Sequence, residues 1–182
     1  QAIPRSAYDN VFGWTDEDIT RYCMNYDVVS AQLYDVHPPN ESNKNISVYE
    51  LFNISHNITD LDKTINIIKT KYPDYLKTAE EYLSQKKSSY FNMVIMKKEI
   101  FQNYCEWLFS ILFELENRIS ISKNEYQSRV FGFIGERLLN IYLNNLRQEK
   151  KYHIKSAKSI LEYSNHKREK STFSVFSYLK KI

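Results

Sequence analysis

The sequence feature that most constrains the fold is a short apolar run followed at once by a long amphipathic segment. Residues 90–96 are almost all apolar or aromatic, and they predict a β-strand. In residues 99–119 apolar side chains recur at three- and four-residue spacing, which is typical of a helix packed along one face. The apolar positions of that helix are Phe101, Tyr104, Leu108, Ile111, Leu112, Leu115 and Ile119. A strand that leads into a long core helix predicts a mixed α/β body.

Asn92 is a polar side chain inside this apolar run. A buried amide that lacks partners costs about 1–3 kcal/mol. Asn92 is therefore predicted either to tie the structure together or to face a ligand.

The remaining elements are predicted from caps and periodicity. Thr15, with Asp18 three residues later, has the pattern of a helix cap, and Thr59-Asp60 is expected to cap a second helix that ends before Pro73. The other expected elements are a strand over 27–31, a short helix over 74–86 and a core helix over 125–146. So few strands make a poor sheet by themselves, so we expect the chain to be a fragment of a longer protein.

Composition excludes several classes of protein. The only glycines are Gly13, Gly132 and Gly135, and neither a P-loop nor a GxGxxG turn can be written with them. The two cysteines, Cys23 and Cys105, have no metal-ligand spacing and suggest a reducing compartment, so we expect a cytoplasmic protein. No apolar run approaches the roughly 20 residues of a membrane-spanning helix.

Charge divides the chain into two parts. Residues 144–182 contain ten Lys or Arg and three Glu, whereas residues 1–143 have a net charge of −4. We therefore expect a domain over residues 1–146 and a basic amphipathic, helical tail over residues 147–182. The tail is expected to bind the anionic inner face of a membrane, with a disordered or body-packed terminus that is basic only for solubility as the alternative. The acidic body argues against a nucleic-acid partner.

The triplet Asp60-Leu61-Asp62 has two interpretations. Paired carboxylates can hold Mg²⁺ or Mn²⁺ against the diphosphate of a sugar nucleotide. Helix starts also recruit Asp as caps and for the helix dipole, which is the simpler interpretation here. Nearby His56 is a candidate base or ligand contact, with an ordinary loop histidine as the alternative.

Arg129, Glu136 and Arg137 are the strongest candidates for chemistry. Arg129 and Glu136 are seven residues apart on one helical face, and Gly132 and Gly135 leave that face open. Each helical glycine costs roughly 1 kcal/mol relative to alanine, which suggests close approach of a ligand or of another backbone. An Arg–Glu bridge with tight helix packing is the alternative.

Several motifs in order along the chain resemble one known family. They are Tyr26-Asp-Val-Val29, His56 with Asp60-Leu-Asp62, Tyr72-Pro73, Phe91-Asn-Met93, Met96-Lys-Lys-Glu99, Tyr104-Cys-Glu-Trp-Leu-Phe109, Phe113-Glu-Leu-Glu116, Arg129-Val-Phe-Gly-Phe133 and Glu136-Arg-Leu-Leu139. From about Tyr26 to Leu146 the chain resembles bacterial capsule, exopolysaccharide and lipopolysaccharide glycosyltransferases long labelled as a domain of unknown function. Members begin with a strand-rich segment and a His-Tyr-Arg-Arg-Tyr-like motif, and only Arg5 and Tyr8 match that motif here. We therefore expect residues 1–146 to be a glycosyltransferase-like domain that lacks its N-terminal donor-binding segment.

The resemblance implies the helix-rich part of a GT-A-like α/β fold and transfer of a hexose from a nucleoside-diphosphate sugar to a surface or lipid-linked glycan. Glu136 is the expected catalytic base, with Asp62 second. Asn92 is expected to bind a sugar hydroxyl, and Arg129 or Arg137 to face the leaving diphosphate; His56 and Arg5 are further substrate-binding candidates. Trp107 could offer a stacking face, although core packing is the simpler role. The competing class is a non-catalytic helical module that binds a membrane or polyanion through its basic tail.

Overall fold

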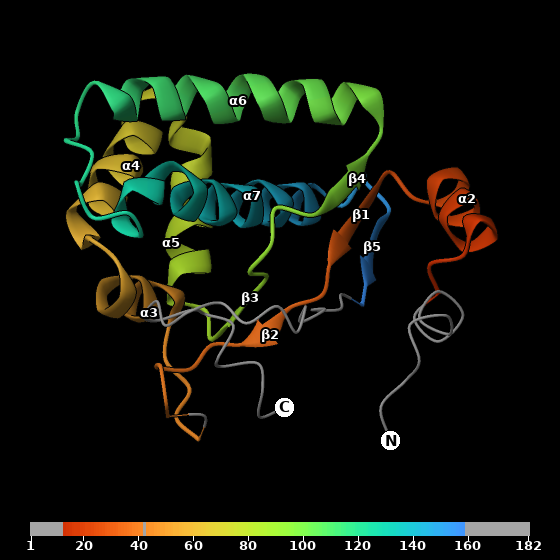
Figure 1. The fold of residues 1–182 in the computed structure, drawn as a ribbon. Helices are drawn as coiled ribbons and strands as arrows, with labels where there is room; N and C mark the ends of the chain where they lie inside the picture. Colours follow the sequence, from red (N-terminus) through yellow and green to blue (C-terminus); the bar gives the residue numbers. More distant parts are fainter. Residues whose placement is uncertain (1–12, 42, 159–182) are drawn as a thin grey trace.

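The computed structural model describes residues 13–41 and 43–158 of the chain (Figure 1). In chain order its elements are α2 (Asp16–Asn25), β1 (Val28–Ala31), β2 (Tyr34–Asp35), α3 (Val48–Ser55), α4 (Ile58–Lys71), η2 (Pro73–Tyr75), α5 (Leu76–Ser84), β3 (Lys87–Ser88), β4 (Val94–Met96), α6 (Lys98–Glu116), η3 (Gln127–Arg129), α7 (Val130–Glu149) and β5 (Ile154–Ala157). This is a mixed α/β fold, rich in helix and poor in strand, as the sequence predicts.

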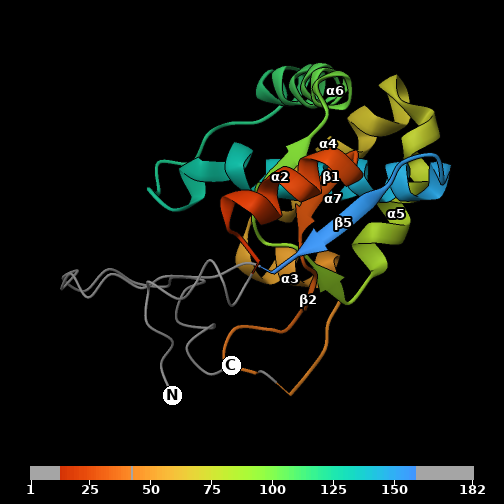
Figure 2. The same ribbon diagram turned by 90° about the vertical axis from the view of Figure 1, so that its right-hand side faces the viewer.

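A three-stranded sheet closes one end of the molecule, and β1 is its central strand. β1 pairs antiparallel with β4 and parallel with β5, with Val28 opposite Met96 on one side and Ile154 on the other. All four residues of β1 are buried. A separate pair, β2 and β3, is antiparallel. Figure 2 shows β5 and α2 on the outer side of the molecule, next to β1.

Asp27 holds the three strands together where β1 begins. Its backbone N–H donates to the carbonyl of His153 at 2.8 Å, and its carbonyl accepts from the N–H of Lys97 at 2.9 Å. Its carboxylate is 2.6 Å from Lys97 Nζ and accepts from the N–H of His153 at 2.7 Å. These bonds hold the pKa of the Asp27 carboxyl below its usual range, first through Lys97 and then through His153.

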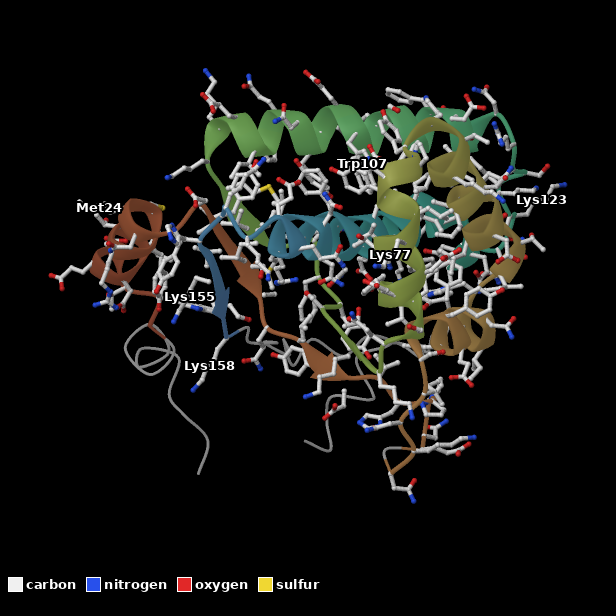
Figure 3. The ribbon with its side chains drawn as sticks, turned by 180° about the vertical axis from the view of Figure 1, so that it is seen from behind. Met24, Lys77, Trp107, Lys123, Lys155 and Lys158 are labelled. Atoms are coloured by element: carbon white, nitrogen blue, oxygen red, sulfur yellow. The ribbon has the colours of Figure 1, made fainter. Side chains whose placement is uncertain are left out.

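The helices form the rest of the body around α7. Figure 1 shows α6 running alongside α7, with α4 and α5 at the end away from the sheet. Trp107 on α6 is 4% exposed and packs against the rings of Tyr75 and Tyr142, with centroids 5.0 and 5.5 Å away. It lies beneath α6 in Figure 3 and is a core residue, not a surface for stacking a sugar. Among the described helices, none is both long and apolar enough to cross a bilayer.

The main helices and the central strand confirm their predictions. The hydroxyl of Thr15 accepts from the N–H of Asp18 at 3.1 Å and so caps α2. The segments expected at 27–31, 99–119 and 125–146 correspond to β1, α6 and α7. The 20-residue α7 is preceded by the short turn η3, so the helix itself begins at Val130.

Two local predictions were wrong. The strand expected over 90–96 is reduced to Val94–Met96, because its pairing with β1 stops where Val94 lies opposite Ser30. α4 begins at Ile58 and not after Thr59-Asp60, because Asn57 Oδ1 accepts from the N–H of Thr59 at 3.3 Å.

Two further elements lie outside what the sequence predicted. α3 was missed, although Ser47 and Glu50 form a full capping box at its start. Residues 147–157, assigned to the tail from charge alone, belong to the body: α7 extends past residue 146 to Glu149, and β5 pairs with β1. Net charge did not locate the boundary between body and tail, because β5 pairs with β1 through backbone hydrogen bonds that do not depend on the charge of the segment.

Candidate active site at the start of α7

The candidate site is built where the chain enters α7. Asn124 Oδ1 accepts from the N–H groups of Tyr126 at 3.0 Å and Gln127 at 3.1 Å, which turns the loop after α6 into η3. Gln127 Nε2 then donates to the carbonyl of Ser55 at 3.1 Å and fastens this turn to the end of α3. The turn therefore delivers the first residues of α7 beside α3.

Five side chains meet there: Glu136, Arg137, His56, Tyr126 and Phe133, which we call the α7 cluster. Glu136 and Arg137 form an ion pair, with Oε2 2.8 Å from Nη1. The glutamate side chain is 26% exposed and the arginine side chain is 6% exposed. The carboxylate thus reaches the surface while its partner stays inside.

Arg137 is held among aromatic rings inside the protein. Its guanidinium carbon lies 5.3 Å from the centroid of the Phe52 ring, and Nη1 also donates to the carbonyl of Phe133 at 3.5 Å. Arg137 Nε is buried without a hydrogen-bond partner among the described residues. The sequence alternative of an Arg–Glu bridge is therefore present, but it links neighbours in the chain and leaves the carboxylate partly open.

The surroundings of Glu136 raise the pKa of its carboxyl group. Burial is the larger influence, and the positive charges of Arg137 and then Arg129 partly oppose it. A carboxylate with a raised pKa is a stronger base at neutral pH. Perturbed carboxylates of this kind are found preferentially at functional sites.

His56 caps the end of α3 and lies within the aromatic part of the cluster. Its ring stacks on Phe133, with centroids 4.0 Å apart, and on Tyr126 at 5.8 Å. Burial, helped by the charge of Arg137, lowers the pKa of His56 to about 4, so the imidazole is neutral at pH 7. His56 is therefore not an ordinary loop histidine, because it is half-buried and its Nδ1 is enclosed without a partner among the described groups.

Asn92 lies beside α7 but is exposed, so the prediction that it is buried was wrong. Its Nδ2 is 3.8 Å from the position that a Cβ on Gly135 would occupy. The buried amide of this region is Asn140, which is 2% exposed and lies between Leu139 and Ile141 on α7. A polar residue at an inward position of an otherwise apolar helix was the sequence signal for it.

Neither glycine of α7 lies against another backbone, and Gly132 is exposed whereas Gly135 is buried. A Cβ at Gly132 would meet no atom within 4 Å, and at Gly135 it would make only an ordinary contact with Asn92. Of the two explanations for these glycines, close approach of another backbone is not seen in the described structure.

Asp60 and Asp62 lie apart from the α7 cluster. Asp60 is 8% exposed in the first turn of α4, and burial raises the pKa of its carboxyl group. Asp62 is exposed, and its Oδ1 accepts from the hydroxyl of Tyr49 at 2.9 Å. Side chains two positions apart on a helix do not face one another, so this pair does not fit a shared metal ion. In the described ranges no three His, Cys, Asp or Glu side chains gather in a way that could hold a metal.

Arg129 is the exposed cation of the site. Its guanidinium carbon lies 5.7 Å from the centroid of the Phe133 ring, and among the described residues it makes no ion pair. It precedes the first residue of α7, where backbone N–H groups and the helix dipole also favour an anion. Arg5, the remaining sequence candidate, lies outside the described residues, as do residues 159–182 of the basic tail.

Comparison with known proteins assigns the chain to a family. The model of a family described as "Domain of unknown function (DUF4422)" matches residues 5–150. The chain belongs to the DUF4422 family. The matched range includes the whole α7 cluster together with Asn92, Asn140 and Arg129, so these residues lie within the DUF4422 domain. The resemblance to a family labelled as a domain of unknown function is confirmed, and so is the helix-rich, mixed α/β class of the fold.

A solved structure is similar to this DUF4422 chain over almost its whole length. It is the apo structure of WbbM, a bifunctional glycosyltransferase, with 29% sequence identity and a TM-score of 0.76. The match covers 94% of this chain and 30% of the WbbM chain, so the DUF4422 chain spans less than a third of that protein. The comparison with curated proteins gave no match.

Proposed function

We propose that this chain is part of a glycosyltransferase that moves a hexose from a nucleoside-diphosphate sugar to a bacterial surface polysaccharide or lipid-linked glycan. The observation that carries the proposal is the Glu136–Arg137 pair: a partly exposed carboxylate of raised pKa above a buried guanidinium. The similarity to part of the glycosyltransferase WbbM supports it.

Glu136 acts as the general base in this proposal. Its carboxylate accepts the proton of the acceptor hydroxyl while that oxygen forms a bond to the anomeric carbon of the donor. The bond from the anomeric carbon to the diphosphate breaks, and the diphosphate leaves with the electron pair. General-base catalysis of this kind contributes roughly 10²–10⁴-fold to a rate.

Arg129 is the better of the two arginine candidates for the leaving diphosphate. Its guanidinium is exposed, whereas that of Arg137 is buried and already paired with Glu136. A guanidinium matches phosphate oxygens through two parallel hydrogen bonds. Arg137 then keeps the region around Glu136 positive without itself contacting the donor.

Asn92 and His56 complete the proposed site. The exposed amide of Asn92 can donate to and accept from a sugar hydroxyl beside Gly135. Neutral His56 supports the site through its stacking on Phe133. Asp62 is the second candidate base; it lies on α4, and its carboxylate already accepts a hydrogen bond from Tyr49 on α3.

Binding of the donor diphosphate through Mg²⁺ or Mn²⁺ is still a prediction from the sequence. Exposed Asp62 can offer carboxylate oxygens, whereas Asp60 is buried. Donor binding measured with and without EDTA, in wild type and in Asp62→Asn, tests this prediction. Unchanged binding in EDTA would remove the cation from the proposal.

Melting of the chain in the presence of UDP-, GDP- and CMP-sugars tests the function, followed by assays for slow hydrolysis of any sugar nucleotide that stabilises the protein. We expect one nucleotide class to raise the melting temperature and Glu136→Gln to slow hydrolysis by roughly 10²–10⁴-fold. Glu149→Gln is the matched control, because Glu149 lies at the far end of the same helix, where it pairs with Lys151 and accepts a hydrogen bond from Asn145. If no sugar nucleotide stabilises the chain and none is hydrolysed, the proposal fails.

Attachment to the inner face of the membrane is proposed for the basic tail, most of which lies outside the described residues. Lys and Arg near an anionic leaflet contribute about 1 kcal/mol each. Co-sedimentation with anionic but not neutral vesicles, weakened by salt, is the expected result. Equal sedimentation with and without residues 159–182 would contradict it.

A further inference from the structure

The side chain of Asn140 bonds two segments that are far apart in the sequence. Its Oδ1 accepts from the N–H of Ser89 at 3.3 Å, and its Nδ2 donates to the carbonyl of Ser89 at 3.0 Å. The same Nδ2 donates to the carbonyl of Glu136 at 2.8 Å, one helical turn earlier. A side chain that is only 2% exposed thus satisfies both backbone groups of Ser89 from α7.

Ser89 begins the irregular segment 89–93 that carries Asn92 across α7. Just before it, the hydroxyls of Ser88 and Tyr82 are 2.7 Å apart. Beyond it, β4 is held by its ladder with β1. Between these anchors the Ser89–Asn140 bonds join the segment to α7, and Asn92 then lies next to Gly135.

We infer that Asn140 is a positioning residue that sets the placement of Asn92 relative to Glu136. It bonds the backbone of the segment that carries the amide and, at its other end, the carbonyl of Glu136 itself. This inference rests on the proposed function, because it assigns one of the two placed groups to a hydroxyl of the substrate sugar and the other to the base.

Only an amide makes all three bonds from this position. Asparagine has one carbonyl oxygen that accepts and one NH₂ group with two donors, which matches the three backbone groups present. A serine in a helix commonly bonds the carbonyl four residues before it. Asn140→Ser therefore keeps the bond to Glu136 and loses both bonds to Ser89, whereas Asn140→Ala loses all three.

Kinetics of these two variants, with sugar-nucleotide hydrolysis as the assay, test the inference. We expect Asn140→Ser and Asn140→Ala both to lower kcat/KM by at least about tenfold. The loss should be mostly in kcat, because Asn92 and Glu136 lose their relative placement while the donor contacts at Arg129 remain. Thr78→Val is the matched control, since it removes another hydrogen bond to α7, from Oγ1 of the buried Thr78 to Gln148 Oε1 at 3.0 Å.

If Asn140 is only structural, its variants should lose no more kcat than Thr78→Val does when the two lower the melting temperature equally. That result would overturn the inference. The side-chain NH₂ resonances of Asn92 give a second readout that needs no activity. They should shift in Asn140→Ser and stay in place in Thr78→Val. Unshifted Asn92 resonances in Asn140→Ser would also overturn the inference. If the wild-type chain hydrolyses no sugar nucleotide, the proposed function is contradicted. The resonances then still test whether Asn140 sets the placement of Asn92.

Discussion

Glu136 and Arg137 are neighbours in the chain, and their side chains form an ion pair of 2.8 Å in which the guanidinium is buried and the carboxylate is not. Burial raises the pKa of Glu136, while the adjacent positive charge keeps the ionised form accessible. A half-buried carboxylate with a fixed cation beneath it is suited to take up a proton and release it again.

Glu136→Gln should lower turnover by roughly 10²–10⁴-fold, because the amide keeps the shape of the side chain but cannot accept the proton. The melting temperature should change little. Turnover on the preferred sugar nucleotide and thermal melts measure the two effects. A near-normal rate would mean that Glu136 is structural and that the base lies elsewhere.

Arg137→Met should move the acidic limb of the pH–rate profile to higher pH. Activity requires ionised Glu136, so it falls as pH drops through the pKa of Glu136, and loss of the neighbouring cation raises that pKa further. Profiles of kcat/KM for wild type and variant measure the shift. Arg118→Met is the control, because Arg118 forms a comparable pair with Glu114 on α6. Coincident acidic limbs in all three proteins would contradict the role of Arg137.

The free energy of unfolding should decrease as the pH falls from about 6.5 to about 4, because of the protonation of His56. The pKa of His56 is lowered to about 4, so the unfolded chain binds a proton in this window that the folded chain does not. The full effect is on the order of 3 kcal/mol. His56→Phe should keep the stacking and flatten this dependence in urea unfolding curves measured at pH 7 and 4.5. Parallel losses of stability in both proteins would show that His56 is not the group involved.

Asn92→Ala should weaken substrate binding while changing the free energy of unfolding by no more than about 0.5 kcal/mol, because the side chain is exposed. Calorimetric titration and urea unfolding separate the two effects. A loss of stability of several kcal/mol with unchanged affinity would reverse the assignment and make Asn92 a structural tie.

Asp27→Asn should cost about 1.5–3 kcal/mol at pH 7, typical of hydrogen bonds to a charged group. The pKa of Asp27 is lowered in the folded protein, so its contribution is present above the unfolded value near 3.9 and is lost as pH falls through the folded value. Urea unfolding of wild type and variant at pH 7 and pH 3 should show a difference that shrinks at the lower pH. Asp16→Asn, at an exposed position of α2, serves as the control.

Local sequence patterns accounted for the parts of the fold in which neighbours in the chain determine the structure. The three- and four-residue spacing predicted α6 and α7, and the Thr15–Asp18 pattern predicted the start of α2. β3 and β5 were missed, because two- and four-residue strands exist only through their partners across the sheet. Asn92 was misplaced for the same reason, since nothing in its own segment reveals that Asn140 bonds the backbone three residues earlier.

The sequence by itself determined the helix-rich α/β class, the family resemblance, and the presence of a glutamate with two arginines at the start of the last helix. Those features depend on periodicity, on short motifs and on spacing within one helix, all of which are local along the chain. Only the tertiary structure decided that Arg137 is buried and Arg129 exposed, that His56 stacks on Phe133, and that Asn140 holds the segment of Asn92. Burial and long-range hydrogen bonds depend on which segments fold against one another, and that packing also sets the pKa values of Glu136 and His56.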